Sequence, residues 1–296
     1  MKHNIKITII LIAMFIVTQL LGLYVVNHYL VQDNELPYGM KPPVAEQESD
    51  FYTSFLPSII IAFVIAISLL FLLTKFNAEF ILKLWFFIVV IIALGISFSS
   101  FISSIKYAPL FVLILAIPLA FIKIYKRNLL VHNITELFIY PGIAAVFVPI
   151  LNIWTVVILL ILISIYDMWA VWHSGIMQKM AKYQINTLKI FGGFFIPYAS
   201  KQVREKIRNM KKSELKKGKI KINLAILGGG DVIFPIITAG VVFKTLGIWP
   251  AILVMIGATC GLLYLFVKAE KKKFYPAMPF ITIGIFIGMI LGYLVF

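Results

Sequence analysis

The chain has 296 residues, of which 61% are hydrophobic and only 13% are charged. A soluble domain carries about 25% charged residues, so this composition excludes an ordinary soluble enzyme and indicates a multi-pass membrane protein. The net charge of +15 is better explained by basic cytoplasmic loops than by nucleic acid, and we expect no nucleic-acid partner. The single cysteine, Cys260, excludes an internal disulfide and a cysteine metal cluster.

Apolar segments long enough to cross a bilayer, at about 20 residues per crossing, follow one another along the chain. They lie at residues 5–26, 51–74, 79–104, 108–125, 129–149, 151–172, 222–243, 248–268 and 276–296. The sequence therefore predicts an all-α membrane protein, a bundle of nine transmembrane helices in the cell membrane. No small-residue cleavage site follows the first segment, so we do not expect a cleaved signal peptide.

The long segment between the sixth and seventh spans divides the predicted chain into two membrane parts. Residues 174–195 mix apolar and basic side chains, which is typical of an amphipathic helix at the membrane interface. Residues 196–221 are rich in Lys and Arg and predict a flexible cytoplasmic loop that is attracted to anionic lipid. We expect an N-terminal membrane part at 1–195, the loop at 196–221 and a C-terminal membrane part at 222–296.

The basic residues also predict the orientation of the bundle. Most of the 27 Lys and Arg residues lie in segments on the same side as the N-terminus. Because cytoplasmic loops carry an excess of Lys and Arg, the N-terminus is predicted to be cytoplasmic and the C-terminus extracytoplasmic.

Carboxylates within the predicted spans are unusual, because a charge there costs roughly 2.5–3.5 kcal/mol on insertion scales. Glu79 lies four residues before Lys83 and predicts an ordinary helical ion pair. Glu136 lies about one turn after His132 and Asn133. For Glu136 we favour a role as a structural hydrogen-bond anchor over a place in a water-filled cavity.

The other two carboxylates are Asp167 in the sixth span and Asp231 in the seventh, which directly follows Gly228–Gly230. At 1.5 Å per residue they lie about 8 and about 13 Å from the cytoplasmic ends of their spans. Sequential spans are commonly neighbours, so the two carboxylates can meet, and a kink or unwinding at the glycines would close the remaining offset. Two carboxylates in contact in low dielectric share a proton, so that one acts as base and the other as acid. Such a pair can activate water against a peptide carbonyl.

Two further hypotheses use the same two aspartates. A proton- or cation-coupled transporter or channel also needs intramembrane carboxylates. In a purely structural bundle, the aspartates would pair with polar neighbours. Other hydrolytic chemistries find no support, since the sequence has neither a His-Glu-x-x-His zinc motif nor a Gly-x-Ser-x-Gly motif. We expect no metal and no cofactor.

Three short motifs follow one another along the chain. They are Tyr166-Asp167, Gly228-Gly229-Gly230-Asp231 and Pro276-Ala277-Met278-Pro279. In this order they resemble the Tyr-Asp, Gly-x-Gly-Asp and Pro-Ala-Leu motifs of the presenilin and signal-peptide-peptidase family of intramembrane aspartyl proteases, with Met278 in place of leucine. The resemblance covers nearly the whole chain. The predicted orientation matches presenilins, and the compact chain resembles a prokaryotic, archaeal homologue.

The resemblance implies a presenilin-like fold and an aspartic endopeptidase of the Gly-x-Gly-Asp type, with Asp167 and Asp231 as the catalytic pair. It also implies that Tyr166, Gly228–Gly230 and Pro276–Met278 lie against the active site. The implied substrates are transmembrane helices, unwound and cut near their cytoplasmic ends. An unwound substrate can regain hydrogen bonds by adding to enzyme backbone as a strand, for which the glycines and 276–279 are the expected places. The physiological substrate, accessory subunits and self-cleavage within 196–221 stay open.

Overall fold

The computed structural model describes residues 5–30, 36–40, 57, 61, 65, 68, 79–102, 107–126, 128–174, 190, 192–198, 223–269 and 275–296. Within these ranges, eight helices are long and apolar enough to cross a membrane. The predicted second span, 51–74, lies outside the described residues except at four single positions. The number of nine spans therefore stays a prediction.

The described helices follow the predicted spans in order. They are α1 (Ile5–Leu30), α4 (Glu79–Ile102), α5 (Ala108–Phe121), α6 (Leu129–Phe147), α7 (Ile153–Trp169), α11 (Gly229–Leu246), α12 (Ile248–Lys268) and α13 (Met278–Val295). Short helical turns are η1 (Pro37–Gly39), η3 (Ile122–Lys126), η4 (Val148–Ile150) and η5 (Ala170–Ser174). Two strands, β1 (Gly193–Tyr198) and β2 (Asn223–Gly228), form an antiparallel sheet in which Gly193 lies opposite Gly228.

Local sequence explains where several of the helices begin or end. Asn152 caps α7, because its side chain accepts the Thr155 N–H at 2.9 Å and its own N–H donates to Thr155 Oγ1 at 2.9 Å. Asn128 caps α6 by accepting from the backbone N–H of Leu130 at 2.9 Å. Gly247 separates α11 from α12 with a φ of 94°, which favours glycine.

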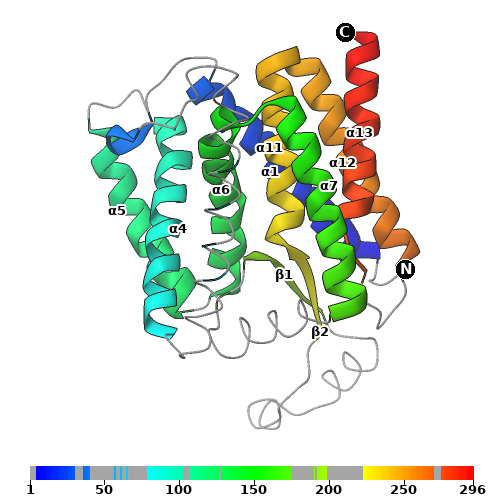
Figure 1. Ribbon diagram of the computed structural model, residues 1–296. Coiled ribbons are helices and arrows are strands. Elements are labelled where there is room, and N and C mark those ends of the chain that lie inside the picture. Colours follow the sequence, from blue (N-terminus) through cyan, green and yellow to red (C-terminus); the bar gives the residue numbers. More distant parts are fainter. Residues whose placement is uncertain are drawn as a thin grey trace.

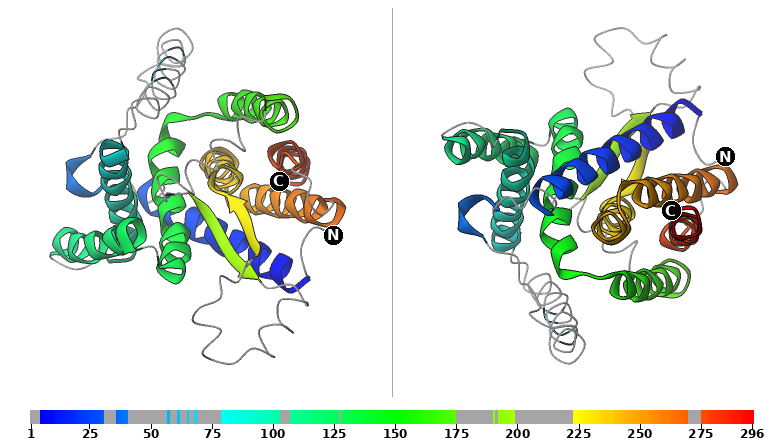
Figure 2. Two further views of the ribbon diagram at one scale, coloured as in Figure 1. Left: turned by 90° about the horizontal axis from the view of Figure 1, so that it is seen from below. Right: turned by 90° about the horizontal axis from the view of Figure 1, so that it is seen from above.

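Helix α11 lies at the centre of the bundle, where it packs against α1, α6, α7, α12 and α13 (Figure 2). Helices α4 and α5 form a flank that contacts the rest mainly through α6. The sheet lies at the end of the bundle that holds the N-terminus, whereas the C-terminus lies at the opposite end (Figure 1). The main hydrophobic core surrounds α11 and includes Phe15, Phe194 and Ile236, all fully buried.

Glycines bring α12 and α13 into close backbone contact. A Cβ added to Gly257 would collide with the carbonyl oxygen of Gly284, and one added to Gly284 would collide with that of Gly257. Gly261 and Gly288 meet backbone of the facing helix in the same way. Glycines four residues apart on each helix allow this close approach.

Two segments that were predicted to be helical form the strands of the sheet instead. Residues 193–195, the end of the predicted interfacial helix, begin β1, and 223–228, the start of the predicted seventh span, form β2. Glycines on both sides of the pairing disfavour a helix there, and the cross-strand bonds supply the backbone partners that a helix would have supplied. Residues 175–189 of the predicted interfacial helix and 199–221 of the predicted loop lie outside the described residues.

Candidate active site

Asp231 lies in the first turn of α11, directly beyond the sheet. The helix begins at Gly229, immediately after the last residue of β2. Asp231 is therefore not deep inside a regular helix as predicted, because an extended strand replaces the first turns of that span. The Gly228 backbone N–H bonds to the Asp231 carboxylate. A helix N-terminus favours such an anion, since its first amides have no partner within the helix.

Asp167 lies near the end of α7, with only 8% of its surface exposed. Its Oδ2 accepts the backbone N–H of Met278 at 3.1 Å, and the Ala277 backbone also bonds to the carboxylate. Because Met278 begins α13, this carboxylate also lies at a helix N-terminus. One turn earlier, Ser164 Oγ donates to Thr282 Oγ1 at 2.9 Å. These bonds hold the end of α7 against the start of α13.

The two aspartates come from adjacent helices, since α7 packs against α11. Their carboxylates are close enough to interact electrostatically. Within the part of the chain that the structure describes, no hydrogen bond joins them directly. Like charges at close range in a buried site favour one negative charge and one proton on the pair, which is the state required for acid and base chemistry.

The other residues of the predicted active-site wall lie in different environments. Pro276 and Met278 are buried, and the backbone of 277–278 contacts Asp167 as described. Tyr166 is 57% exposed, and its ring lies 6.3 Å from that of Trp169 on the outer surface of α7. Of the three glycines, Gly230 is exposed, whereas Gly228 and Gly229 are half-buried.

Tyr140 on α6 is a residue of this region that the motifs do not indicate. It is buried, and its hydroxyl oxygen would lie 2.7 Å from a Cβ added to Gly229. It also lies within electrostatic range of Glu136 and Asp231. The sequence could have indicated Tyr140 through its spacing of one helical turn from Glu136, because this spacing places both side chains on one face of the span.

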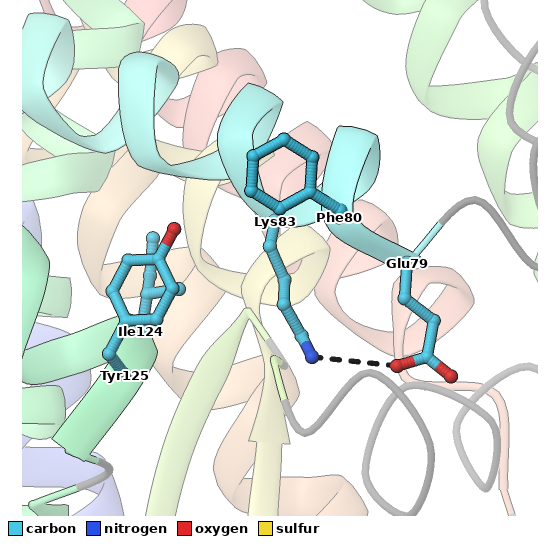
Figure 3. A pocket seen from close by; sticks show the side chains of 5 residues that line it. All are labelled: Glu79, Phe80, Lys83, Ile124 and Tyr125. Carbon is cyan, nitrogen blue, oxygen red and sulfur yellow. Dashed lines mark hydrogen bonds and ion pairs between the residues drawn. The ribbon is translucent and has the colours of Figure 1, made fainter.

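A pocket of about 360 Å³ lies elsewhere, between the start of α4 and η3 (Figure 3). It is lined by Glu79, Phe80, Lys83, Ile124 and Tyr125. The predicted ion pair is confirmed there, with Lys83 Nζ 3.5 Å from Glu79 Oε2. Neither element carries a predicted catalytic aspartate, so this pocket is separate from the candidate site. Across the described ranges, no three His, Cys, Asp or Glu side chains gather as a metal site would require.

Comparison with known proteins identifies the family. The family model for signal-peptide peptidase and presenilin aspartyl protease matches residues 12–296. The chain belongs to this family. No curated protein matches the chain.

Two solved structures, both of a presenilin family intramembrane aspartate protease, have a similar fold. The structure in space group C222 has a TM-score of 0.60 and 18% identity, over 98% of this chain and 99% of that one. The structure in space group P2 has a TM-score of 0.60 and 20% identity, over 97% of each chain. The predicted presenilin-like fold of a multi-pass membrane protein is therefore confirmed, whereas the orientation of the termini stays a prediction.

Gly229 is expected to tolerate no side chain. In Gly229→Ala the new Cβ would lie 2.7 Å from the Tyr140 hydroxyl oxygen and 3.1 Å from its ring atom Cε1. We expect a loss of about 1–3 kcal/mol in the free energy of unfolding, as is usual for overpacking. Thermal unfolding in detergent measures it, and the double variant Gly229→Ala/Tyr140→Phe should regain part of the loss.

The adjacent Gly230→Ala is the matched control, because its Cβ would meet no atom closer than 3.8 Å. It should leave the unfolding midpoint unchanged or raise it, since alanine favours a helix more than glycine does. Equal losses in Gly229→Ala and Gly230→Ala would show that contact with Tyr140 is not the cause.

Proposed function

We propose that the protein is an intramembrane aspartyl protease of the Gly-x-Gly-Asp type, with Asp167 and Asp231 as its catalytic pair. It hydrolyses peptide bonds of transmembrane helices in the cell membrane. The observation that carries the proposal is the approach of these two carboxylates from α7 and α11, in a chain of an aspartyl protease family. No observation favours a transporter or channel.

The reaction uses the single proton that the pair shares. The ionised carboxylate takes a proton from a water molecule as the water oxygen attacks the peptide carbonyl carbon. The protonated carboxylic acid gives its proton to the carbonyl oxygen, which produces a tetrahedral diol. The C–N bond then breaks while the nitrogen takes a proton from the pair and one hydroxyl of the diol gives its proton back to the pair, which leaves a new carboxyl group and a new amine. The pair returns to one proton and one negative charge.

The helix N-termini at the site have a defined part in this chemistry. The Met278 N–H bond fixes the position of the Asp167 carboxylate, and the start of α11 fixes Asp231. Both carboxylates are thus held by backbone amides before a substrate arrives, and such pre-organisation lowers the cost of reaching the transition state. The segment 276–278 therefore acts through its backbone, so that methionine at 278 suits the role as well as leucine.

The open edge of β2 is the proposed place for an unwound substrate. The Gly229 N–H bonds to the Gly192 carbonyl at 3.1 Å, which sets the alternation of bonds along the antiparallel pair. By this alternation Gly228, Ile226 and Leu224 point away from β1. The Gly228 N–H is already bonded to Asp231, so the backbone groups left on this edge are those of Leu224 and Ile226. An extended substrate that pairs with them would regain hydrogen bonds lost on unwinding. Its scissile bond would lie near Asp231, which follows β2 by three residues.

The position along the bundle supports cleavage close to one membrane face. The sheet, the start of α11 and the end of α7 all lie at the end of the bundle that holds the N-terminus (Figure 1). With the predicted orientation, this end is cytoplasmic, so water has a short route to the pair. Transmembrane helices are accordingly the proposed substrates, and the lipid bilayer is the medium that presents them.

The catalytic pair is tested by Asp167→Asn and Asp231→Asn. Each change keeps the size of the side chain but removes the acid or base, so the rate of cleavage of a tagged single-span substrate should fall at least about a thousandfold. Mass spectrometry of the products measures cleavage, and thermal unfolding checks that each variant is folded. Glu79→Gln, at the partly exposed ion pair of α4, should keep full activity. Full activity of either aspartate variant would contradict the assignment.

Strand addition is tested by Ile226→Pro, which removes one N–H from the open edge of β2 and none that bonds to β1. We expect the KM for a single-span substrate to rise about tenfold, since one hydrogen bond to the substrate is lost. Ile226→Val keeps the N–H and should behave as the wild type. An unchanged KM in a folded Ile226→Pro protein would show that substrates do not pair with this edge.

A further inference from the structure

The outer edge of β1 is bonded to side chains of α6. Asn133 Nδ2 donates to the Phe195 carbonyl at 2.7 Å, and Asn133 Oδ1 accepts the Phe195 N–H at 2.9 Å. The amide side chain thus pairs with β1 as the backbone of a third strand would. Two residues earlier along the strand, His132 Nε2 lies 2.8 Å from the Gly193 carbonyl oxygen, and the Gly193 N–H donates to Glu136 Oε1 at 3.4 Å.

These contacts satisfy every donor on that edge of the strand. The residues of β1 that point away from β2 are Gly193, Phe195 and Pro197, and Pro197 has no N–H. Both available N–H groups are bonded to α6. Within the part of the chain that the structure describes, the sheet is therefore asymmetric, because α6 closes the outer edge of β1 while no other element bonds to the outer edge of β2.

A buried cation completes the cluster. Lys123 Nζ, from η3, lies 2.6 Å from Glu136 Oε1 and 3.1 Å from His132 Nδ1, and the side chains of Lys123 and Glu136 are only 5% and 2% exposed. A carbonyl only accepts and an ammonium only donates, so His132 carries its proton on Nε2 and accepts from Lys123 at Nδ1. Every member of the cluster therefore has a partner that orients it.

Stability alone does not account for these charges. Well-packed apolar residues in place of a buried ion pair are often as stable or more stable, because removing both charges from water is costly. A hydrogen-bonded ion pair does fix the orientation of the groups that it joins, which apolar contacts do not. The fixed strand leads directly to the candidate site, because β1 holds β2 through the whole register from Gly193 to Tyr198, and β2 continues into the helix that carries Asp231.

We propose that Lys123, His132, Asn133 and Glu136 are positioning residues for the catalytic pair. This cluster, the β1 anchor, holds β1 to α6 and so fixes β2 and the first turn of α11 with Asp231. Its catalytic consequence rests on the proposed protease function, whereas its structural claim does not. None of the four residues forms a hydrogen bond or an ion pair with Asp167 or Asp231.

Two variants release β1 in different ways. Asn133→Leu removes both bonds to Phe195 without disturbing a charge. Lys123→Met/Glu136→Leu removes the ion pair as a whole, which avoids an unpaired buried charge. The matched control is Glu79→Leu/Lys83→Met, which removes the partly exposed pair on α4. Should the buried double variant fail to fold, Asn133→Leu carries the test.

Two readouts separate the claims. Hydrogen–deuterium exchange of 193–198 and 223–228 reports the sheet directly and needs no activity. In both anchor variants we expect the Gly193 and Phe195 amides to exchange at least about tenfold faster, with the control unchanged. In each anchor variant that folds, we expect kcat to be about tenfold lower than in the wild type, with KM within about twofold of the wild-type value. Product masses should show new cuts one or two residues from the main site.

Each outcome decides a claim. Unchanged exchange in both variants would overturn the anchor. Faster exchange with unchanged kcat and unchanged cut positions would show that the cluster holds the sheet without positioning the pair, and would overturn the proposal. Absence of cleavage by the wild type would refute the proposed protease function, while the exchange experiment would still decide whether the anchor exists.

Discussion

Backbone groups inside a membrane must find partners within the protein, and the short sheet beside Asp231 depends on this constraint. An open two-stranded sheet has two free edges, which are costly away from water. Here α6 closes one edge with the side chains of His132, Asn133 and Glu136. Within the described residues, no element bonds to the other edge, along β2. We propose that this edge is the place where an unwound helix docks and regains its hydrogen bonds.

The same principle explains how two acidic side chains are placed within a membrane protein. Asp167 ends its own helix, where the dipole disfavours an anion, but it bonds to the first amide of α13. Asp231 lies in the first turn of α11. Each carboxylate therefore meets the amides of a helix N-terminus rather than a cation. With amide partners, the pair keeps one proton and one negative charge. A lysine or arginine at the site would neutralise that charge.

The sequence was sufficient to predict the helices and the catalytic candidates. Apart from the start of the seventh span, where β2 replaces helix, apolar length predicted the described spans to within a few residues, and α12 coincides with the predicted 248–268. The three short motifs selected Asp167 and Asp231. Apolar length predicts helices well because it is a local property of the sequence. The motifs are local too, and the catalytic role of the two aspartates stays a prediction.

The sheet and its anchor could not be predicted because they depend on contacts distant in sequence. Each strand has only six residues, and β2 is continuous with a longer apolar segment, so hydropathy does not separate it from the helix that follows. Glu136 was predicted to be a structural hydrogen-bond anchor, and its bonds to Lys123 and Gly193 agree with that prediction. Lys123, however, is buried, although it lies in a basic segment with Lys126 and Arg127 that the predicted orientation places on the cytoplasmic side. Nothing in its local sequence distinguishes it from a lysine at the membrane surface.

The central claim is that Asp167 and Asp231 act together on one reacting carbonyl. An experimental structure of the protein with a transition-state analogue, whose hydroxyl group stands in for the tetrahedral diol, tests it most directly. We expect this hydroxyl to lie within about 3 Å of both carboxylates and the analogue's backbone to pair with β2. An analogue that inhibits cleavage but contacts only one of the two aspartates would contradict it.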